Sequence, residues 1–354
     1  MRVLQVIQEL RRGGAETVVH TLVSALAARG DHVEVAAATG PWTDAFTVPV
    51  HPLPLVAQRP TQLLDGTAAV HRAIRWACPD VVHCHNPTMA LISALPTWRG
   101  RRPPTLVTVH GVEAEQYAMA ARVLRLSGAS VVACGPGVRS ALTAAGAKVS
   151  RTIPNGVAPA APAHPRAELR RSFGLPEDAT VIASVGRLVP LKRHDLAIRA
   201  VSLLPEVYLL VVGAGDEEGT LRQQAVDTGV VDRVVFTGLR DDVSALLGAV
   251  DAMVLCSRGE GLPLTLLESL AAGTAVVAVD VPGVREVVRH EHDGLLCAAT
   301  PEALADAVQR VRSDATLATR LTTAGLETVR PYAEARMIED YLDAYRRLRG
   351  GEPL

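Results

Sequence analysis

The segment 257–268 carries two glutamates, one on a loop between glycines and one in the helical pattern that follows. Glu260 lies on the loop and Glu268 in the helix, so we expect both carboxylates to face one cleft. Pro263 has the fixed backbone φ suited to the first turn of a helix. The backbone N–H groups at this positive helix end belong to Gly261, Leu262 and Leu264. The segment therefore combines carboxylates that accept hydrogen bonds from sugar hydroxyls with N–H groups that bind an anion.

Two cations follow an apolar run earlier in the chain. Arg187 comes directly after Gly186 at the end of that run, and Lys192 follows a short turn. Cations at a helix start oppose the helix dipole, which favours a bound anion, although a solvated helix start is the alternative. A charge-assisted hydrogen bond contributes about 1.5–3 kcal/mol, against about 0.3–1 kcal/mol for a helix-end dipole, so the side chains should dominate phosphate binding. Phosphate-binding cations and sugar-binding carboxylates together predict a nucleotide-sugar site.

Three further glycine-containing loops close expected strands. Gly14 lies in the loop 11–16, which lacks the G-x-G-x-x-G spacing of dinucleotide-binding loops. Its two adjacent glycines still allow the backbone to approach a substrate closely. Gly213, Leu239 and Arg240 lie in two later loops that we predict to line a base pocket. Ordinary turns explain these loops about as well.

Three histidines lie at the ends of expected strands in the first half of the chain. His83 and His85 flank Cys84, so the two imidazoles share one face of a strand. A metal pair is conceivable, but no other ligand cluster appears nearby, and polar residues that line a cleft are the preferred interpretation. His110 ends the run 105–109 and points toward the same cleft, although a single histidine of this kind is more often structural.

The composition limits the classes of partner and cofactor. The chain has 354 residues with 36 basic and 37 acidic side chains, and aromatic residues make up 3%, so nucleic acid is not an expected partner. Five scattered cysteines without a C-x-x-C pair indicate reduced thiols and neither a disulfide framework nor a zinc site. The N-terminal apolar run is too short for a signal peptide, and no later run reaches the roughly 20 residues that span a bilayer. We therefore expect a cytoplasmic protein without stable membrane insertion.

Short apolar runs alternate with helical patterns along the chain, which is typical of α/β proteins with parallel sheets layered by helices. Expected strands of the first half lie at 3–7, 32–37, 80–83, 105–110, 130–133 and 148–153. Those of the second half lie at 180–185, 208–212, 234–237, 252–256, 275–279 and 295–297. A proline-rich stretch at 153–165 separates the two series and is expected to act as a hinge. The site residues follow strands, as ligand-binding residues do in open parallel sheets.

In this order and at these spacings, the motifs resemble those of the GT-B glycosyltransferases, specifically the retaining family 4 within glycosyltransferase group 1. The resemblance covers nearly the whole chain. It is carried by Gly13-Gly14-Ala15-Glu16, Val109-His110-Gly111, Ile153-Pro154-Asn155-Gly156-Val157, Gly186-Arg187 with Lys192, the pair Glu260 and Glu268, Gly283 with Glu286, and Asp293-Gly294-Leu295-Leu296.

The resemblance implies a GT-B fold, with two Rossmann-like domains whose parallel sheets face across a cleft. Residues 1–157 would form the N-terminal domain, which binds the acceptor, and a C-terminal helix at about 332–354 would pack back on it. Residues 158–331 would form the C-terminal domain, which binds the nucleotide-sugar donor.

The resemblance also implies a role for each site residue. Arg187 and Lys192 would bind the diphosphate, Glu268 the ribose hydroxyls, and Glu260 the donor sugar together with backbone N–H groups. His110 would contact the donor sugar, and Gly14 would approach the phosphate. Family members transfer the sugar with retention of configuration and need neither a metal nor another cofactor. On the acceptor side we place His85 and Glu113, and the further donor-binding residues are Gly186, Gly213, Leu239, Arg240, Gly261, Leu262, Pro263 and Leu264.

The substrates are less well determined than the reaction class. We expect a hexose donor carried by UDP, with GDP and ADP as alternatives, and a hydroxyl acceptor. The alanine- and arginine-rich composition is similar to that of high-GC bacterial proteins, so a soluble small molecule of specialised metabolism is the preferred acceptor and a lipid the other. Two rival functions stay open: a nucleotide-sugar 2-epimerase with Glu113 and Glu115 as acid and base, and a non-catalytic nucleotide-sugar-binding partner. The oligomeric state is not specified by the sequence.

Overall fold

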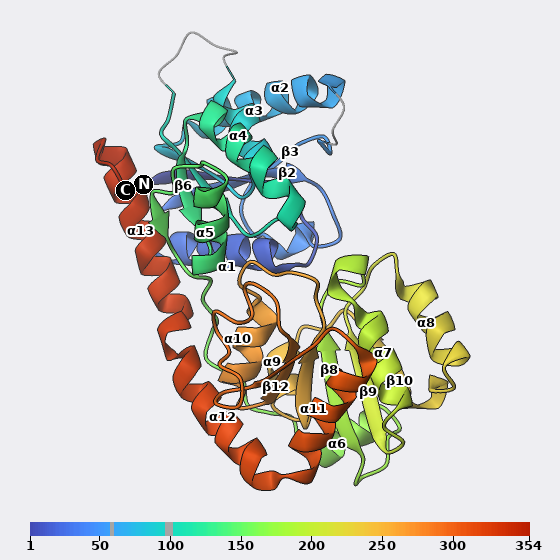
Figure 1. The fold of residues 1–354 in the computed structure, drawn as a ribbon. Helices are drawn as coiled ribbons and strands as arrows, with labels where there is room; N and C mark the ends of the chain where they lie inside the picture. Colours follow the sequence, from blue (N-terminus) through green and yellow to red (C-terminus); the bar gives the residue numbers. More distant parts are fainter. Residues whose placement is uncertain (57–59, 96–101) are drawn as a thin grey trace. The chain divides into compact units, whose positions relative to one another are not determined.

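The computed structural model describes residues 1–56, 60–95 and 102–354 of the chain. It contains two compact units (Figure 1). Unit 1 consists of Met1–Asn155 and Ala335–Leu354, and unit 2 consists of Gly156–Glu334. The chain therefore leaves unit 1 near Asn155 and returns to it for its last helix.

Unit 1 is built on a parallel sheet with the strand order β3-β2-β1-β4-β5-β6-β7 within the described residues. The strands are β1 (Arg2–Glu9), β2 (His32–Ala38), β3 (Val50–Pro52), β4 (Val81–Cys84), β5 (Thr105–Val109), β6 (Ser130–Ala133) and β7 (Arg151–Thr152). The order reverses between β1 and β4, and such a switch point is where ligands bind in sheets of this type. The loop after β1 leads to Gly14, and His85 lies directly after β4.

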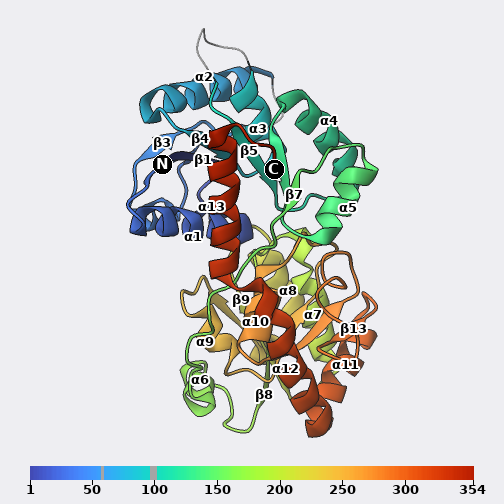
Figure 2. The same ribbon diagram turned by 90° about the vertical axis from the view of Figure 1, so that its left-hand side faces the viewer.

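The helices of unit 1 connect its strands or cover the sheet. They are α1 (Gly14–Ala28), η1 (Thr43–Ala45), α2 (Pro60–Ala77), α3 (Pro87–Ala94), η2 (Ala114–Gln116), α4 (Tyr117–Ser127), α5 (Pro136–Ala144) and α13 (Glu334–Gly350). Figure 2 shows α13 lying along the sheet of this unit. Arg151 of β7 forms ion pairs of 2.6 Å with both Asp340 and Asp343 of α13. Tyr341 and Tyr345 are fully buried beneath the helix, so α13 is part of the core of unit 1.

Unit 2 repeats this plan with the strand order β10-β9-β8-β11-β12-β13, all parallel. The strands are β8 (Thr180–Val185), β9 (Val207–Val212), β10 (Val234–Gly238), β11 (Ala252–Leu255), β12 (Ala275–Val279) and β13 (Leu295–Cys297). The order reverses between β8 and β11, so these neighbours form the switch point. Their carboxyl ends lead into the loops of Arg187 and Glu260.

Helices pack on the sheet of unit 2. They are α6 (Arg166–Ser172), η3 (Pro190–Lys192), α7 (His194–Ser202), α8 (Glu218–Asp227), η4 (Val231–Arg233), α9 (Val243–Leu247), α10 (Leu264–Ala271), α11 (Pro301–Ser313), α12 (Ala315–Val329) and η5 (Arg330–Tyr332). One apolar core joins α7, α8, α11 and the start of α12 to the strands. Branched residues dominate the strands because both faces of a parallel sheet are buried.

The segments that lead into and out of unit 2 pair with each other. Val157 donates its N–H to the carbonyl of Tyr332 at 2.8 Å and accepts from the N–H of Glu334 at 2.9 Å. Gly156 lies so close to this return segment that an added Cβ would stand 2.7 Å from the Cα of Glu334. A side chain at this position would therefore push the two segments apart.

Each predicted strand is present in the structure, and the errors concern short segments. The final strand of unit 1 was predicted at 148–153 but is limited to Arg151–Thr152. Val50–Pro52 forms a strand that the sequence did not indicate, because three residues ending in proline carry too little alternation to signal one. In the described part of the chain, no helix has both the length and the apolar character needed to span a bilayer.

Candidate active site

The loop after β8 carries Gly186 and Arg187 and lies against the loop after β9. Gly186 donates its N–H to the carbonyl of Val212 at 2.9 Å. A Cβ added to Gly213, whose φ is +140°, would overlap the Gly186 carbonyl oxygen. Glycine is therefore required at position 213, where the backbone of this loop touches that of Gly186. Arg187 at the tip is exposed and forms no ion pair with residues that the structure describes.

His194, the first residue of α7, contacts the backbone of this loop. It is 3% exposed, and its Nε2 lies 3.1 Å from the carbonyl oxygen of Arg187. Because a carbonyl only accepts, His194 carries its proton on Nε2 and accepts from the hydroxyl of Ser184 at Nδ1, 2.8 Å away. Burial, in the first place, lowers the pKa of His194 to about 4. The ring is therefore neutral at pH 7 and fixes the backbone of Arg187.

Lys192 and Glu260 meet across the switch point. The Nζ of Lys192 lies 2.6 Å from Oε1 of Glu260, and Ser257 donates its hydroxyl to the same oxygen at 2.6 Å. The side chains of Lys192 and Glu260 are 19% and 9% exposed, so the pair is largely shielded from water. Oε2 of Glu260 has no hydrogen bond to a described residue and is available to a ligand.

The loop of Glu260 leads into α10. Pro263 has φ −72° and ψ 119° and precedes the helix as its N-cap, whereas the sequence placed it within the first turn. Gly261, Leu262 and Leu264 are buried around this helix start. Glu268 lies in α10 and is half-buried. A Cβ on Gly283 would overlap the carbonyl oxygen of Glu260, so glycine is required for the approach of the loop after β12.

Leu239 and Arg240 directly follow β10, the strand that pairs with β9, and Gly213 directly follows β9. The guanidinium of Arg240 donates to both carboxylate oxygens of Asp242 at 2.7 and 2.6 Å, and it lies over the ring of Phe173. The bidentate hydrogen bond from Arg240 holds the pKa of Asp242 at about 2. Leu239 is 54% exposed, so its side chain could cover a flat ligand group.

Gly14 and Glu113 lie in the segments that follow β1 and β5 of unit 1. Gly14 is exposed at the first position of α1, with Gly13 as an extended N-cap at φ −168°. Glu113 is exposed before η2, in the segment that follows β5. Both positions are open to a ligand.

His83, His85 and His110 form a stacked group in unit 1. The ring centroids of His83 and His85 lie 4.0 Å apart, as their shared strand face predicts. Both nitrogens of His83 are engaged, with Tyr345 at 2.7 Å and Thr108 at 2.8 Å. Those of His85 are engaged with Gln5 at 2.7 Å and His110 at 3.1 Å. An acceptor or a metal could reach either ring only by breaking these bonds.

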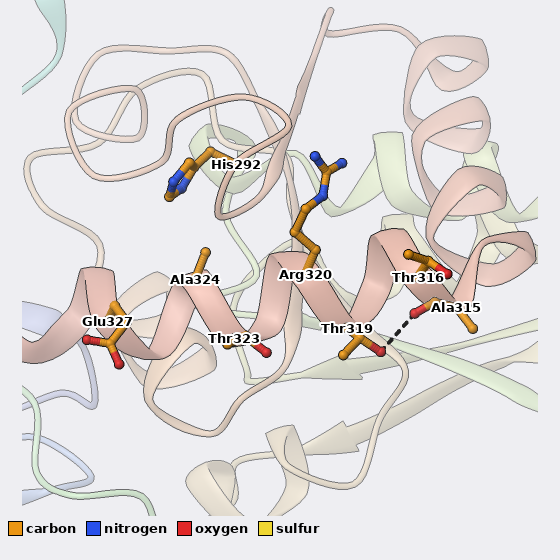
Figure 3. A pocket seen from close by; sticks show the side chains of 8 residues that line it. All are labelled: His292, Ala315, Thr316, Thr319, Arg320, Thr323, Ala324 and Glu327. Carbon is orange, nitrogen blue, oxygen red and sulfur yellow. Dashed lines mark hydrogen bonds between the residues drawn. The ribbon is translucent and has the colours of Figure 1, made fainter.

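Among the described residues, neither a cluster of metal ligands nor a surface pocket on α12 adds to this site. Over the residues that the structure describes, no group of three or more histidine, cysteine, aspartate or glutamate side chains could hold a metal ion. A pocket of about 810 Å³ lies along α12, lined in part by Thr319, Arg320 and Thr323 (Figure 3). His292 reaches it from the loop before β13, and none of the predicted site residues lines it.

Comparison with known families decides the class of the protein. The family model Glycosyl transferases group 1 matches residues 165–328, and Glycosyltransferase Family 4 matches residues 12–161. The chain belongs to the group 1 glycosyltransferases. The two matches fall on the two units, and the strand order of each unit agrees with the GT-B fold of this family.

One relative is the lipopolysaccharide core biosynthesis glycosyltransferase LpsE of Rhizobium meliloti. It is 37% identical over 52% of this group 1 glycosyltransferase and 54% of the relative. A D-inositol 3-phosphate glycosyltransferase of Stackebrandtia nassauensis is 30% identical over 80% of this chain and 66% of the relative. The chain thus spans about half the length of LpsE and of the related LpsD, which is matched over 55% of its length.

Solved structures share the fold. Anabaena Alr3699/HepE, in complex with UDP and glucose, has a TM-score of 0.86 at 20% identity, covering 98% of this chain and 99% of that one. WaaG, a glycosyltransferase of lipopolysaccharide biosynthesis, has a TM-score of 0.78 at 19% identity, covering 97% and 99%. At these identities the likeness establishes the GT-B fold of both units.

The structure adds residues that sequence reasoning did not select. His194 and Ser184 support the Arg187 loop, Ser257 supports Glu260, and Gln5 supports His85. Gln5 could have been noticed as the one polar residue inside the apolar run of β1. For His194 the position beside Lys192 was the only signal.

Proposed function

We propose that the chain is a retaining glycosyltransferase that transfers a hexose from a UDP-sugar to an acceptor hydroxyl without a metal ion. The observation that carries the proposal is the ion pair of Lys192 and Glu260 at the switch point of unit 2, on the same loop after β8 that carries Arg187. A leaving diphosphate gains negative charge as the glycosyl bond breaks. Cations already in place bind that state more strongly than the ground state and so lower the barrier.

Each side chain has a task in this reaction. Arg187 and Lys192 bind the diphosphate, and Glu260 directs its carboxylate toward donor-sugar hydroxyls. Lys192 can bridge Glu260 and a phosphate oxygen, because an ammonium group has three donors and only one bond to Glu260 is present. Glu268 accepts from ribose hydroxyls, and the backbone of Gly261 and Leu262 contributes N–H donors.

Unit 1 supplies the remaining contacts in the proposal. His110 contacts the donor sugar, Gly14 approaches the phosphate, and Glu113 lies on the acceptor side. The departing phosphate helps to remove the proton from the acceptor hydroxyl on the same face, which leads to retention. We propose a soluble small polyol as the acceptor, and the relatedness to a D-inositol 3-phosphate glycosyltransferase supports that choice.

Thermal shift measurements with UDP-glucose, GDP-mannose and ADP-glucose test the donor. A ligand at about 100 times its Kd raises the unfolding free energy by about 2.7 kcal/mol. We expect the largest shift with a UDP-sugar and its loss in Arg187→Ala. The control Arg199→Ala removes another exposed arginine, on α7, and should keep the shift. Equal shifts in both variants would contradict the assignment of Arg187.

Product analysis tests the reaction. With a cyclitol acceptor and EDTA present, NMR should show a product that keeps the anomeric configuration of the donor. Epimerised donor formed without acceptor would instead indicate the isomerase function. Donor binding without turnover on any acceptor until another protein is added would indicate a binding partner.

A further inference from the structure

A branched chain of buried polar side chains links α13 to His110 within unit 1. Its members come from β1, β4 and the residue that follows it, β5 and α13, and each is at most 3% exposed. They are Gln5, His83, His85, Thr108, Tyr341 and Tyr345. Buried polar groups of this kind must satisfy one another, so the direction of one hydrogen bond constrains the next.

The side-chain amide of Gln5 sets the direction of the hydrogen bonds in this chain. Its Nε2 donates to the hydroxyl of Tyr345 at 3.1 Å, and its Oε1 lies 2.7 Å from Nε2 of His85. Since an amide oxygen only accepts, His85 carries its proton on Nε2. The 2.7 Å spacing is that of a short N–H···O bond, which agrees with the amide oxygen facing the ring.

The tautomer of His85 in turn determines the tautomer of His110. Burial lowers the pKa of His110 to about 4 and that of His85 well below its usual range, so both rings are neutral at pH 7. A neutral imidazole has one N–H and one acceptor nitrogen. The Nδ1 of His85 therefore accepts from Nε2 of His110 across 3.1 Å, and His110 is left with an unprotonated Nδ1.

That last nitrogen has no partner in the described structure. Nδ1 of His110 is buried and forms no hydrogen bond to any residue that the structure describes. A buried acceptor without a partner costs about 1–3 kcal/mol, which a bound ligand would recover. We propose that Gln5 and His85 are positioning residues that fix His110 in the Nε2–H form, so that its Nδ1 selects a hydrogen-bond donor of the ligand.

The proposal defines the chemistry of the ligand group. A hydroxyl or amino group can donate to Nδ1, whereas a carboxylate or a phosphate oxygen would meet its lone pair and be repelled. The tautomer follows from unit 1 alone. The identity of the donating group as a sugar hydroxyl rests on the proposed function.

NMR of protein labelled with ¹⁵N-histidine tests the tautomer without any ligand. The His110 resonances are assigned with His110→Ala. In the free protein we expect a proton on Nε2 of His110 and none on Nδ1. A protonated Nδ1 would overturn the proposal, because it requires every hydrogen bond of the branch to run the other way.

Two variants test the source of the tautomer. Gln5→Leu should leave His110 with a mixture of both tautomers. If Gln5→Leu does not fold, Tyr345→Phe removes the hydroxyl that holds the Gln5 amide and should give the same mixture more weakly. Tyr341→Phe removes an equally buried hydroxyl from the same helix, but one bonded to Thr108, and should keep the Nε2–H form. An unchanged tautomer in both Gln5→Leu and Tyr345→Phe would overturn the role of Gln5.

A series of deoxy nucleotide sugars tests the recognised group. In the wild type, one deoxy donor should lose about tenfold or more in kcat/KM, because about 1–2 kcal/mol of hydrogen bonding is lost. In Gln5→Leu the same deoxy donor should show a smaller penalty. An equal loss of kcat/KM in the wild type and in Gln5→Leu would overturn the proposal that Nδ1 of His110 selects a hydrogen-bond donor of the ligand. If no nucleotide sugar binds at all, the proposed function fails while the NMR result still decides the tautomer.

Discussion

Lys192 Nζ lies 2.6 Å from Glu260 Oε1, so a cation from the loop after β8 and a carboxylate from the loop after β11 form one ion pair. Lys192 and Glu260 are 68 residues apart in the chain. They meet because β8 and β11 are neighbours in the sheet. The ion pair is largely shielded from water, because the side chains of Lys192 and Glu260 are 19% and 9% exposed.

Substitution of Lys192 should lower the catalytic rate strongly and the unfolding free energy only moderately. Lys192→Ala is expected to lower kcat by about 10²–10³, because one donor to the leaving phosphate is removed. The carboxylate of Glu260 then lies nearly buried without its cation, so the unfolding free energy should fall by about 1–3 kcal/mol. Steady-state kinetics and urea unfolding measure the two effects.

The double variant Lys192→Ala/Glu260→Gln is the matched control for stability. It removes the uncompensated charge and should recover most of the lost unfolding free energy. Activity should stay low, because the phosphate donor is still missing. Near-normal kcat in Lys192→Ala would contradict the role of the lysine.

His194 should control the loop of Arg187 and show its own pH dependence. Its pKa of about 4 in the folded protein is below the unfolded value of 6.5, so its stabilising contribution is complete above pH 6.5. That contribution is lost as the pH falls from 6.5 toward 4. His194→Ala should raise the KM for the donor and lower the unfolding free energy at pH 7 by about 1–3 kcal/mol.

His194→Gln keeps a side-chain N–H for the Arg187 carbonyl and should retain more activity than His194→Ala. Urea unfolding at pH 7 and pH 5 should show the gap between wild type and His194→Gln narrowing at the lower pH. If the difference in unfolding free energy between wild type and His194→Gln widened at pH 5, the assignment of a neutral, buried His194 ring would be wrong.

Two glycines of neighbouring segments should respond oppositely to alanine. Gly213→Ala places a Cβ against the Gly186 carbonyl at a φ of +140°, so the unfolding free energy should fall by about 1–3 kcal/mol and donor binding should weaken. Gly219 lies in α8 with nothing within 4 Å of its Cβ position. Gly219→Ala should therefore stabilise the protein by about 0.5–1 kcal/mol. Calorimetry and donor titration check both, and a neutral Gly213→Ala would show that the loops are not in contact.

Asp242 should stabilise unit 2 in a pH window set by Arg240. Its folded pKa of about 2 lies below the usual 3.8, so its contribution is present above about pH 4 and is lost as the pH falls toward 2. Asp242→Asn should cost about 1 kcal/mol at pH 7 after solvent screening is considered. The difference from wild type should shrink between pH 5 and pH 3. A constant difference would mean that the carboxylate charge does not matter.

Much of the fold could be predicted because the local signals are strong. Apolar runs bounded by glycine and proline marked β8 at Thr180–Val185 and β12 at Ala275–Val279 with the same bounds as the structure. The loops that carry Arg187 and Glu260 were also expected after strands, and the structure places them after β8 and β11. Val50–Pro52 was missed, since its pairing to β2 gives its strand conformation and its own pattern does not.

The sequence by itself determined where strands end and which loops carry charge, because those properties depend on neighbouring residues. Only the tertiary structure decided that β8 and β11 are adjacent and that Gln5 and Tyr345 orient His85. Each of these relations joins residues far apart in the chain. Packing and hydrogen-bond satisfaction select such partners among many, and no local pattern records the choice.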